Sequence, residues 1–269
     1  MEVNGRDIIV DGMNLHYNEM GNGKTVIMLH GGGPGTTGWN NFYGNIGEFS
    51  KHFRVLLLDL PGWGGSAGKE PIVVNQNRPA FNARAVKSFM KALGIEKASL
   101  IGNSMGGATA TSCAIQFPDI VDKLVLTGAA GASPLPQSSS SLLSETFANP
   151  TKSNLRRWAL KAMVYDPKYV TDELIESRSK AMSPQHQQGF LRSKGLNLGD
   201  LSKDYPKIRA DTFVVWGRED ASLPLLENGM KMLTGITNAE MHVFSHCGHW
   251  VMIERVDEFN RLVLDFLED

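Results

Sequence analysis

A serine flanked by glycines is the residue of this 269-residue sequence best suited to act as a nucleophile. Ser104 stands in GNSMG (residues 102–106), between a short apolar run (98–101) and a stretch of small residues (107–114). G-x-S-x-G between a strand and a helix is typical of a sharp turn that exposes the serine hydroxyl. Glycine avoids the crowding in such a turn. We therefore predict that Ser104 is a nucleophile; the alternative is a Gly-rich turn without a catalytic role.

A serine hydroxyl needs a base to remove its proton, and a carboxylate to orient that base. His249 follows the apolar run 241–244, and Asp220 follows the run 213–216. If these runs are parallel strands, both residues lie on loops at the edge of the sheet that carries Ser104. The sequence thus predicts a triad of Ser104, Asp220 and His249. Other candidates in the neighbouring loops are His246, Glu219 and Glu254.

A second requirement is a set of backbone N–H groups that stabilise the oxyanion. The loop HGGGPG (30–35) follows an apolar run, and its glycines allow close backbone approach. We predict one donor from Met105, next to the nucleophile, and one from Gly32. His30 is expected to support the loop. A phosphate-binding loop is disfavoured, because the segment lacks both Lys-[Ser/Thr] and G-x-G-x-x-G spacing.

The elements that position these residues follow from short, near-continuous apolar runs, which are typical of strands covered on both faces. Segments with helical periodicity, such as 79–93, separate the runs. Residues 7–20 resemble a hairpin around Asp11-Gly12. We therefore predict an α/β fold with a mostly parallel central sheet flanked by helices. The expected core strands contain residues 26–29, 55–58, 98–101, 124–126, 213–216 and 241–244.

One block interrupts the alternation of strand and helix. Residues 133–206 contain no clear buried strand and begin with a Ser- and Pro-rich linker. Such an insertion after the sixth strand would cover the carboxyl edge of the sheet, where ligands bind. We predict a helical lid at 133–206 on a core domain made of 1–132 and 207–269. The alternative is a surface subdomain without a catalytic role.

Composition narrows the class of protein further. The formal net charge is −1, the basic residues do not cluster, and 42% of the residues are hydrophobic. These features argue against nucleic-acid binding and for a sizeable core. Two cysteines, no visible signal peptide and no long apolar stretch predict a cytoplasmic protein without a membrane partner.

These motifs together resemble the α/β-hydrolase superfamily, which uses the same order of serine, acid and histidine. Within it, the sequence is most similar to the meta-cleavage product hydrolases, which cut a carbon–carbon bond during the breakdown of aromatic compounds. The triple glycine, the asparagine before the nucleophile and the tryptophan after the histidine are the more specific features. The matching segments are HGGGPG (30–35), GWNN (38–41), GNSMGG (102–107), WGRED (216–220), CGHW (247–250) and DEFNRLV (257–263).

The resemblance implies an anionic 2-hydroxy-6-oxohexa-2,4-dienoate substrate with a substituent at C6 that the sequence does not identify. It implies no metal or organic cofactor, and a homodimer or larger homo-oligomer. A lid arginine is expected to hold the carboxylate, and a guanidinium suits that task; competing arginines are Arg156, Arg157 and Arg192. By position, the implied substrate-binding residues are Gly33, Asn41, Asn103, Arg178 and Trp250. Alternative roles are an exposed charge for Arg178 and simple packing for Trp250.

Other functions remain open at this point. A carboxylesterase or lactonase would use the same triad. An aminopeptidase would need lid acids such as Glu173 and Glu176 to bind a substrate ammonium group. A non-catalytic ligand-binding member of the fold is the alternative from another class. Enzymes of the superfamily with an aspartate nucleophile are disfavoured by Ser104.

Overall fold

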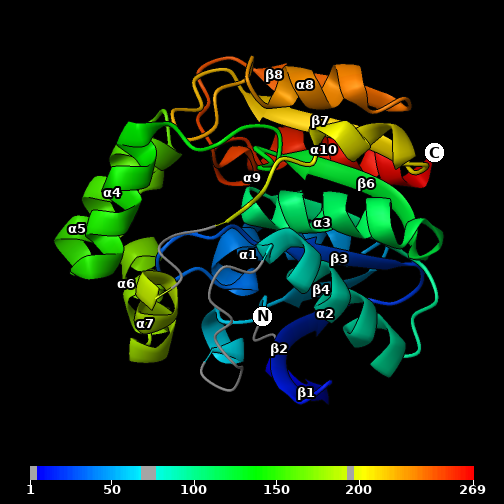
Figure 1. Cartoon of the computed structure of the whole chain (residues 1–269), viewed down its shortest axis with the longest axis horizontal. Coiled ribbons are helices and arrows are strands. Elements are labelled where there is room, and N and C mark those ends of the chain that lie inside the picture. Colours follow the sequence, from blue (N-terminus) through cyan, green and yellow to red (C-terminus); the bar gives the residue numbers. More distant parts are fainter. Residues whose placement is uncertain (1–4, 68–76, 193–196) are drawn as a thin grey trace.

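A twisted central sheet organises the molecule. The computed structural model describes residues 5–67, 77–192 and 197–269. In this part of the chain the sheet has eight strands in the order β1-β2-β4-β3-β5-β6-β7-β8 (Figure 1). The strands are β1 (Gly5–Val10), β2 (Met13–Met20), β3 (Thr25–Leu29), β4 (Arg54–Leu58), β5 (Ala98–Asn103), β6 (Val121–Thr127), β7 (Asp211–Gly217) and β8 (Ala239–Phe244).

The sheet is mostly parallel, which confirms the predicted fold class. Strands β1 and β2 form an antiparallel hairpin, and β2 also pairs antiparallel with β4. The hairpin turns at Asp11 and Gly12, whose positive φ angles (49° and 76°) suit a tight two-residue turn. Every neighbouring pair from β4 to β8 is parallel. The parallel strands therefore bring their carboxyl ends to one edge of the sheet.

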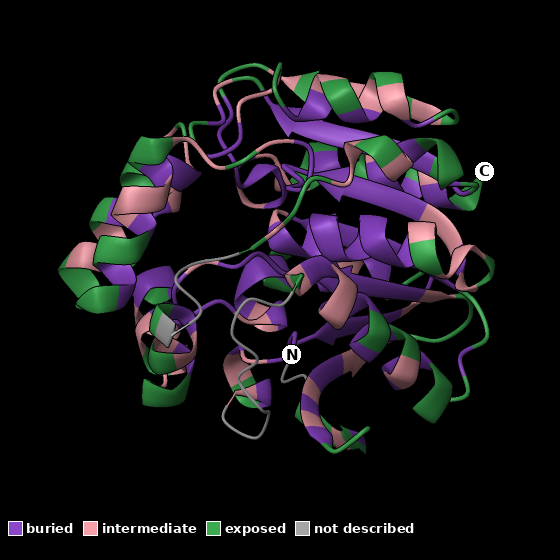
Figure 2. Ribbon diagram, in the orientation of Figure 1, coloured by how far each residue is buried: buried purple, intermediate pink, exposed green. Residues whose placement is uncertain are grey.

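The core consists of two apolar layers, one on each face of the sheet. Successive strand residues alternate between them: Ile27 and Leu29 belong to one layer, Val26 and Met28 to the other. This explains why β3 is apolar throughout, and Figure 2 shows the middle strands as buried. The first layer is closed by α2 (Arg78–Ala92), α3 (Met105–Gln116) and α8 (Gly229–Gly235). The second is closed by α1 (Gly38–Phe49), α9 (Val251–Glu254) and α10 (Val256–Glu268).

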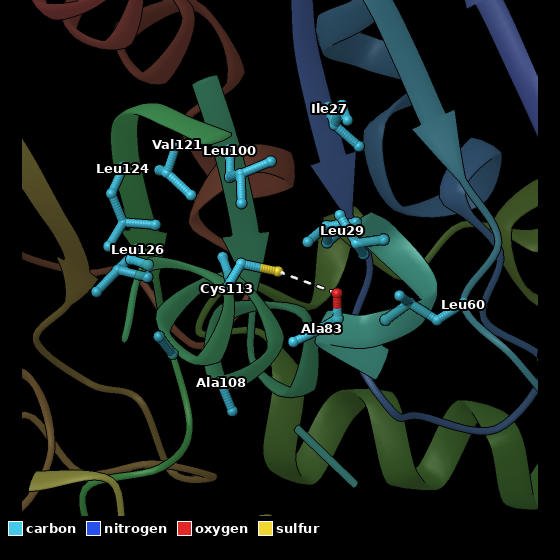
Figure 3. Close-up of a cluster of buried hydrophobic side chains, with 14 of the residues drawn as sticks. Ile27, Leu29, Leu60, Ala83, Leu100, Ala108, Cys113, Val121, Leu124 and Leu126 are labelled. Atoms are coloured by element: carbon cyan, nitrogen blue, oxygen red, sulfur yellow. Dashed lines mark hydrogen bonds between the residues drawn. The ribbon is translucent and has the colours of Figure 1, made fainter. Parts of the chain in front are cut away.

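The small residues after Ser104 allow α3 to pack closely on the sheet. Ala108 and Cys113 are fully buried, and the Cys113 Sγ lies 3.8 Å from the Ala83 carbonyl oxygen of α2 (Figure 3). A Cβ at Gly107 would lie only 2.3 Å from the Ala129 Cβ. Both cysteines of the chain are buried and free.

The described part of residues 133–206 consists of helices that gather beyond the carboxyl ends of the strands (Figure 1). No described helix is long and apolar enough to cross a membrane. The longer helices are α4 (Gln137–Ala148), α5 (Lys152–Trp158), α6 (Asp172–Ala181) and α7 (Pro184–Arg192). The 3₁₀- and π-helical segments of the described residues are η1 (Gly64–Ser66), η2 (Pro118–Ile120), η3 (Ala159–Met163), η4 (Pro167–Tyr169) and η5 (Ser202–Lys207).

Candidate active site

Ser104 forms a strained turn between β5 and α3. Its backbone has φ 54° and ψ −117°, a conformation that L side chains rarely adopt. The Ser104 N–H donates to the carbonyl oxygens of Thr127 (3.2 Å) and Gly128 (3.1 Å), and the Ser104 carbonyl accepts from the N–H groups of Ala108 and Ala130 (3.0 Å each). These bonds hold the serine at the carboxyl end of β5.

The glycines around Ser104 are required because backbone crosses backbone there. A Cβ at Gly102 would lie 2.4 Å from the Gly106 carbonyl oxygen, and a Cβ at Gly106 would lie 2.0 Å from the Leu29 carbonyl oxygen. Such distances leave no room for a methyl group. The glycines of the G-x-S-x-G pattern therefore allow β3, β5 and α3 to cross closely.

The predicted base and acid are in direct contact. The His249 Nδ1 lies 2.7 Å from the Asp220 Oδ2, and both side chains are buried. The other carboxylate oxygen accepts from the N–H groups of Ser222 and Leu223 at 2.8 Å each. A carboxylate held in this way accepts a hydrogen bond from the N–H at Nδ1, which leaves Nε2 as the basic nitrogen. His249 and Ser104 line the same cavity.

The neighbouring acids build the loop that carries His249. Glu254 accepts from the N–H groups of Gly248 (2.6 Å), Tyr165 and Asp166 (2.9 Å each). Burial raises the pKa of Glu254, and these bonds oppose that effect. Glu219 accepts from the Cys247 N–H at 3.1 Å, and His246 is exposed. These contacts place Glu254 and Glu219 in the scaffold around the imidazole, whereas the His246 side chain is exposed.

The glycine-rich loop lies directly against the Ser104 turn. A Cβ at Gly31 would lie 3.3 Å from the Ser104 Cβ, and a Cβ at Gly33 would lie 2.5 Å from the Trp158 ring. Gly32 lines the cavity together with Ser104, whereas Met105 is buried at the start of α3. The N–H groups at a helix start suit a developing negative charge.

His30 uses both ring nitrogens within the protein. Its Nδ1 donates to the Gly31 carbonyl oxygen (2.7 Å), and its Nε2 accepts from the Leu60 N–H (2.9 Å). Since a carbonyl can only accept and an N–H can only donate, these bonds fix the neutral tautomer. Burial lowers the pKa of His30, in agreement with a neutral ring. The expected supporting role fits this geometry.

A buried cation lies next to the cavity. Arg178 of α6 is fully buried between two indole rings, 4.4 Å from the Trp250 centroid and 5.4 Å from that of Trp158. One guanidinium nitrogen donates to the Thr36 hydroxyl (2.8 Å) and the Pro34 carbonyl oxygen (3.2 Å). Nε and Nη2 have no partner among the described residues. Burial lowers the pKa of Arg178 to about 9, so the group is charged at neutral pH.

The competing lid arginines have other partners. Arg156 pairs with Asp172 and with the Val170 carbonyl oxygen, and Arg157 lies 2.7 Å from Glu145. The side chain of Arg192 lies outside the described residues. Among the described arginine side chains of residues 133–206, Arg178 is thus the one buried beside Trp250. The lid acids considered for an aminopeptidase, Glu173 and Glu176, are not among the described residues that line the cavity.

Two buried asparagines add polar atoms to the same cavity. The Asn103 Nδ2 donates to the Thr127 carbonyl oxygen (3.0 Å), but its Oδ1 has no partner among the described residues. Both side-chain polar atoms of Asn41 are likewise unpaired within the described chain. An unpaired buried polar atom costs about 1–3 kcal/mol, so this arrangement suits a polar ligand.

The cavity is small, with a volume of about 30 Å³. Sequence reasoning missed several of its walls, because their positions depend on how the helices beyond the sheet pack. Trp158, Met163 and Leu143 enter from those helices, and Thr36 follows the glycine-rich loop. The complete described lining is Gly31, Gly32, Gly33, Thr36, Asn41, Asn103, Ser104, Leu135, Ser139, Leu143, Trp158, Met163, Leu198, Ser222, His249 and Trp250.

Comparison with known proteins agrees with this geometry. Residues 24–256 match the family described as alpha/beta hydrolase fold. The chain is 45% identical over 264 residues to a 2-hydroxy-6-oxo-6-phenylhexa-2,4-dienoate hydrolase of Comamonas testosteroni (94% of this chain, 91% of the relative). It is 42% identical, with the same coverage, to a 2-hydroxy-6-oxononadienedioate/2-hydroxy-6-oxononatrienedioate hydrolase of that species.

A solved structure extends the similarity to the whole fold. A meta-cleavage product hydrolase of Pseudomonas fluorescens, crystallised as a mutant with acetates, superposes with a TM-score of 0.88. It is 31% identical and covers 99% of this chain and 98% of its own. The chain therefore belongs to the α/β-hydrolase fold family. Within that family it belongs to the meta-cleavage product hydrolases.

Proposed function

We propose that this protein hydrolyses the C5–C6 bond of a 2-hydroxy-6-oxohexa-2,4-dienoate with a substituent at C6. The products are 2-hydroxypenta-2,4-dienoate and a carboxylic acid. The observation that carries the proposal is Arg178, a fully buried cation beside the cavity of Ser104 and His249. A buried charge without a carboxylate partner destabilises a fold, and the carboxylate of the substrate would supply that partner. The hydrolase relatives named above support the same reaction.

In the proposed first stage, the dienol tautomerises to the keto form, which makes C5 a carbon leaving group. Arg178 and Trp250 hold the carboxylate end, with the polar atoms of Asn41 and Asn103 toward the enol oxygen. Gly33 lines the same cavity, and its missing Cβ leaves room there for the Trp158 ring. The two indole rings help to keep the planar guanidinium away from water, which strengthens its hydrogen bonds to a carboxylate.

In the second stage, His249 removes the proton from Ser104, and the serine oxygen bonds to C6. The N–H groups of Met105 and Gly32 stabilise the oxyanion. The C5–C6 bond then breaks, and its electron pair moves through C4 and C3 onto the C2 carbonyl oxygen. That oxygen takes the proton from His249, which gives 2-hydroxypenta-2,4-dienoate. A water molecule, deprotonated by His249, hydrolyses the acyl-serine and releases the acid. Asp220 holds the imidazole orientation and stabilises its charged form.

We further propose that residues 133–206 form a lid domain on a core of residues 1–132 and 207–269. Its helices supply the cavity-lining residues Leu143, Trp158 and Met163, so both parts wall the cavity. They also carry the buried Arg178 beside it. Loss of dienoate binding in a lid variant such as Arg178→Ala, with an intact triad, would support this division. Unchanged binding would contradict it.

Two properties of the whole protein belong to the same proposal. Two free, buried thiols fit a reducing compartment, and we propose a cytoplasmic location. We also propose a homodimer or larger homo-oligomer. Strand β8 supports this proposal, because it lies at one end of the described sheet order and exposes Val243.

The reaction is tested with the yellow dienol formed by extradiol cleavage of a catechol. We expect rapid bleaching by the wild-type protein, and a rate lowered about 10⁴-fold in Ser104→Ala, because the nucleophile is lost. The control is Ser112→Ala, a buried serine of α3 outside the described cavity lining, which should bleach normally. Fast turnover of nitrophenyl esters without bleaching would instead indicate an esterase.

A further inference from the structure

The backbone just before His249 contacts both the sheet and the proposed lid. A Cβ at Gly217, the last residue of β7, would lie 2.0 Å from the Gly248 carbonyl oxygen. A Cβ at Gly248 itself would lie 2.8 Å from the Val164 carbonyl carbon. Backbone therefore packs directly on backbone at both contacts. The place of His249 thus depends on the lid segment 163–166 as well as on the sheet.

The segment 163–166 continues from a wall of the reaction cavity. Met163, which ends η3 and begins this segment, lines the cavity. Trp158, which directly precedes η3, lines the same cavity and packs against Trp250, with ring centroids 5.5 Å apart. The Trp250 N–H donates to the Met163 carbonyl oxygen at 3.0 Å. The lid wall of the cavity is thus bonded to the residue that follows His249.

One carboxylate joins the residue before His249 to the same segment. Glu254 ends α9 and is 3% exposed. Its Oε1 accepts from the Gly248 N–H at 2.6 Å. Its Oε2 accepts from the N–H groups of Tyr165 and Asp166 at 2.9 Å each. All three partners are donors, so an ionised carboxylate, which accepts at both oxygens, satisfies them together.

Two other side chains hold the loop between β8 and α9. Glu219 accepts from the Cys247 N–H (3.1 Å), and Arg255 donates to the carbonyl oxygens of residues 245 and 246 (3.0 Å each). In the described contacts, neither side chain bonds to the proposed lid. Glu254 therefore differs from both, because it bonds to this loop and to the lid at once.

We propose that Glu254 is a positioning residue, which fixes the His249 imidazole relative to the lid wall of the reaction cavity. This inference rests on the proposed function. In that reaction His249 takes a proton from Ser104, gives it to the leaving dienoate, and later takes one from water. Each transfer requires the imidazole within hydrogen-bond reach of a bound group. Glu254 takes no part in these transfers and acts through the two pieces of backbone that it holds.

The role of the carboxylate is tested with Glu254→Gln, which keeps the size of the side chain. An amide has one acceptor oxygen, so its NH₂ group must face a backbone N–H at one end of the contact. We expect kcat for the dienoate to fall about tenfold, because a small displacement of a catalytic group slows the reaction. KM should stay near that of wild type, since Arg178 is untouched. The matched control, Glu258→Gln, makes the same change at an exposed acid of α10 and should leave both constants unchanged.

The bond to the lid is tested separately with Asp166→Pro. Proline removes the N–H that donates to the Glu254 Oε2. The Asp166 φ angle of −96° is within about 30° of the angle that proline favours. Asp166→Ala loses the same side chain but keeps the N–H. We expect kcat of Asp166→Pro to be about threefold below that of Asp166→Ala, as one hydrogen bond is lost. In a Glu254→Gln background, Asp166→Pro should cost less than it does alone.

A proton resonance shows whether the imidazole itself has moved. The proton between the His249 Nδ1 and the Asp220 Oδ2, which are 2.7 Å apart, gives a strongly deshielded NMR signal. This signal should shift in Glu254→Gln and stay in place in Glu258→Gln. A purely structural role would lower the stability of the protein without moving the signal.

An unchanged kcat in Glu254→Gln, a rise in KM alone, or an unmoved resonance in the folded variant would overturn the inference. If Glu254→Gln does not fold, the two Asp166 variants decide, and equal kcat values for that pair would overturn it. A wild-type protein that turns over nitrophenyl esters but not the dienoate would contradict the proposed function. The ester kcat, which also depends on His249, then tests the role of Glu254.

Discussion

The guanidinium of Arg178 explains why this site suits an anion. The group is buried, charged at neutral pH and stacked on Trp250, yet Nε and Nη2 have no partner among the described residues. Folding has thus removed this charge from water, and no carboxylate of the described residues pairs with it. The bonds to Thr36 and Pro34 fix its orientation only. A substrate carboxylate would pair with this positive charge and accept the hydrogen bonds that Nε and Nη2 do not make within the described chain.

Removal of Arg178 should therefore weaken the binding of the dienoate selectively. For Arg178→Ala we expect KM for the dienoate to rise about 30-fold, as a charged hydrogen bond is worth about 1.5–3 kcal/mol. KM for a neutral nitrophenyl ester should change little. Steady-state kinetics with both substrates measure the difference.

The matched control is Arg157→Ala, since Arg157 is a lid arginine that pairs with Glu145 at the surface. It should leave both KM values unchanged. Equal losses on the ester and the dienoate in Arg178→Ala would remove Arg178 from the anion site and point to a role in packing alone.

The contact between Asp220 and His249 was predictable from sequence because each residue follows an apolar run. Chain order and residue type were then sufficient to bring Asp220 and His249 together, as their 2.7 Å contact shows. The choice among the lid arginines came from resemblance, since an exposed and a buried arginine look alike in sequence. Trp158 was missed because its indole reaches the cavity through the packing of α5 against Trp250, and that packing has no local signal in the sequence.

At the scale of elements, the strand–turn–helix unit around Ser104 depends on the absence of side chains. The crossing at Gly106 brings α3 within contact of the β3 backbone, and a Cβ would lie 2.0 Å from the Leu29 carbonyl oxygen. The strained φ of Ser104 persists because four backbone hydrogen bonds hold it. The same turn therefore contributes to the stability of the fold and holds the Ser104 side chain in position.

For Gly106→Ala we expect a loss of about 3 kcal/mol or more in the free energy of unfolding, because backbone must move to admit the methyl group. Gly47→Ala is the matched control, since Gly47 lies in α1 with nothing within 4 Å of its Cβ position. That variant should gain up to about 1 kcal/mol from helix propensity. Urea unfolding of the three proteins measures both values; a Gly106→Ala protein as stable as wild type would contradict the close crossing.

At the scale of the whole molecule, the sequence predicted the kind of sheet but not its strand order. Buried parallel strands are apolar throughout, and this pattern distinguishes them from one-sided strands. The order β1-β2-β4-β3-β5-β6-β7-β8 depends on pairings between distant segments, for which no local pattern exists. The same limit applies to the surface, because no local pattern shows which strands form the two ends of the sheet.

The two ends of the sheet make the proposed self-association testable. Val243 on β8 and Ile9 on β1 are exposed apolar residues on the two terminal strands. If copies associate through β8, Val243→Lys should shift the protein to the monomer mass in light scattering after size exclusion, because an edge lysine opposes strand-to-strand contact. Ile9→Lys adds the same charge at the opposite end and should leave the mass at that of the dimer or larger assembly. A monomeric wild-type protein would exclude the homo-oligomer, and dissociation by Ile9→Lys alone would place the interface at β1.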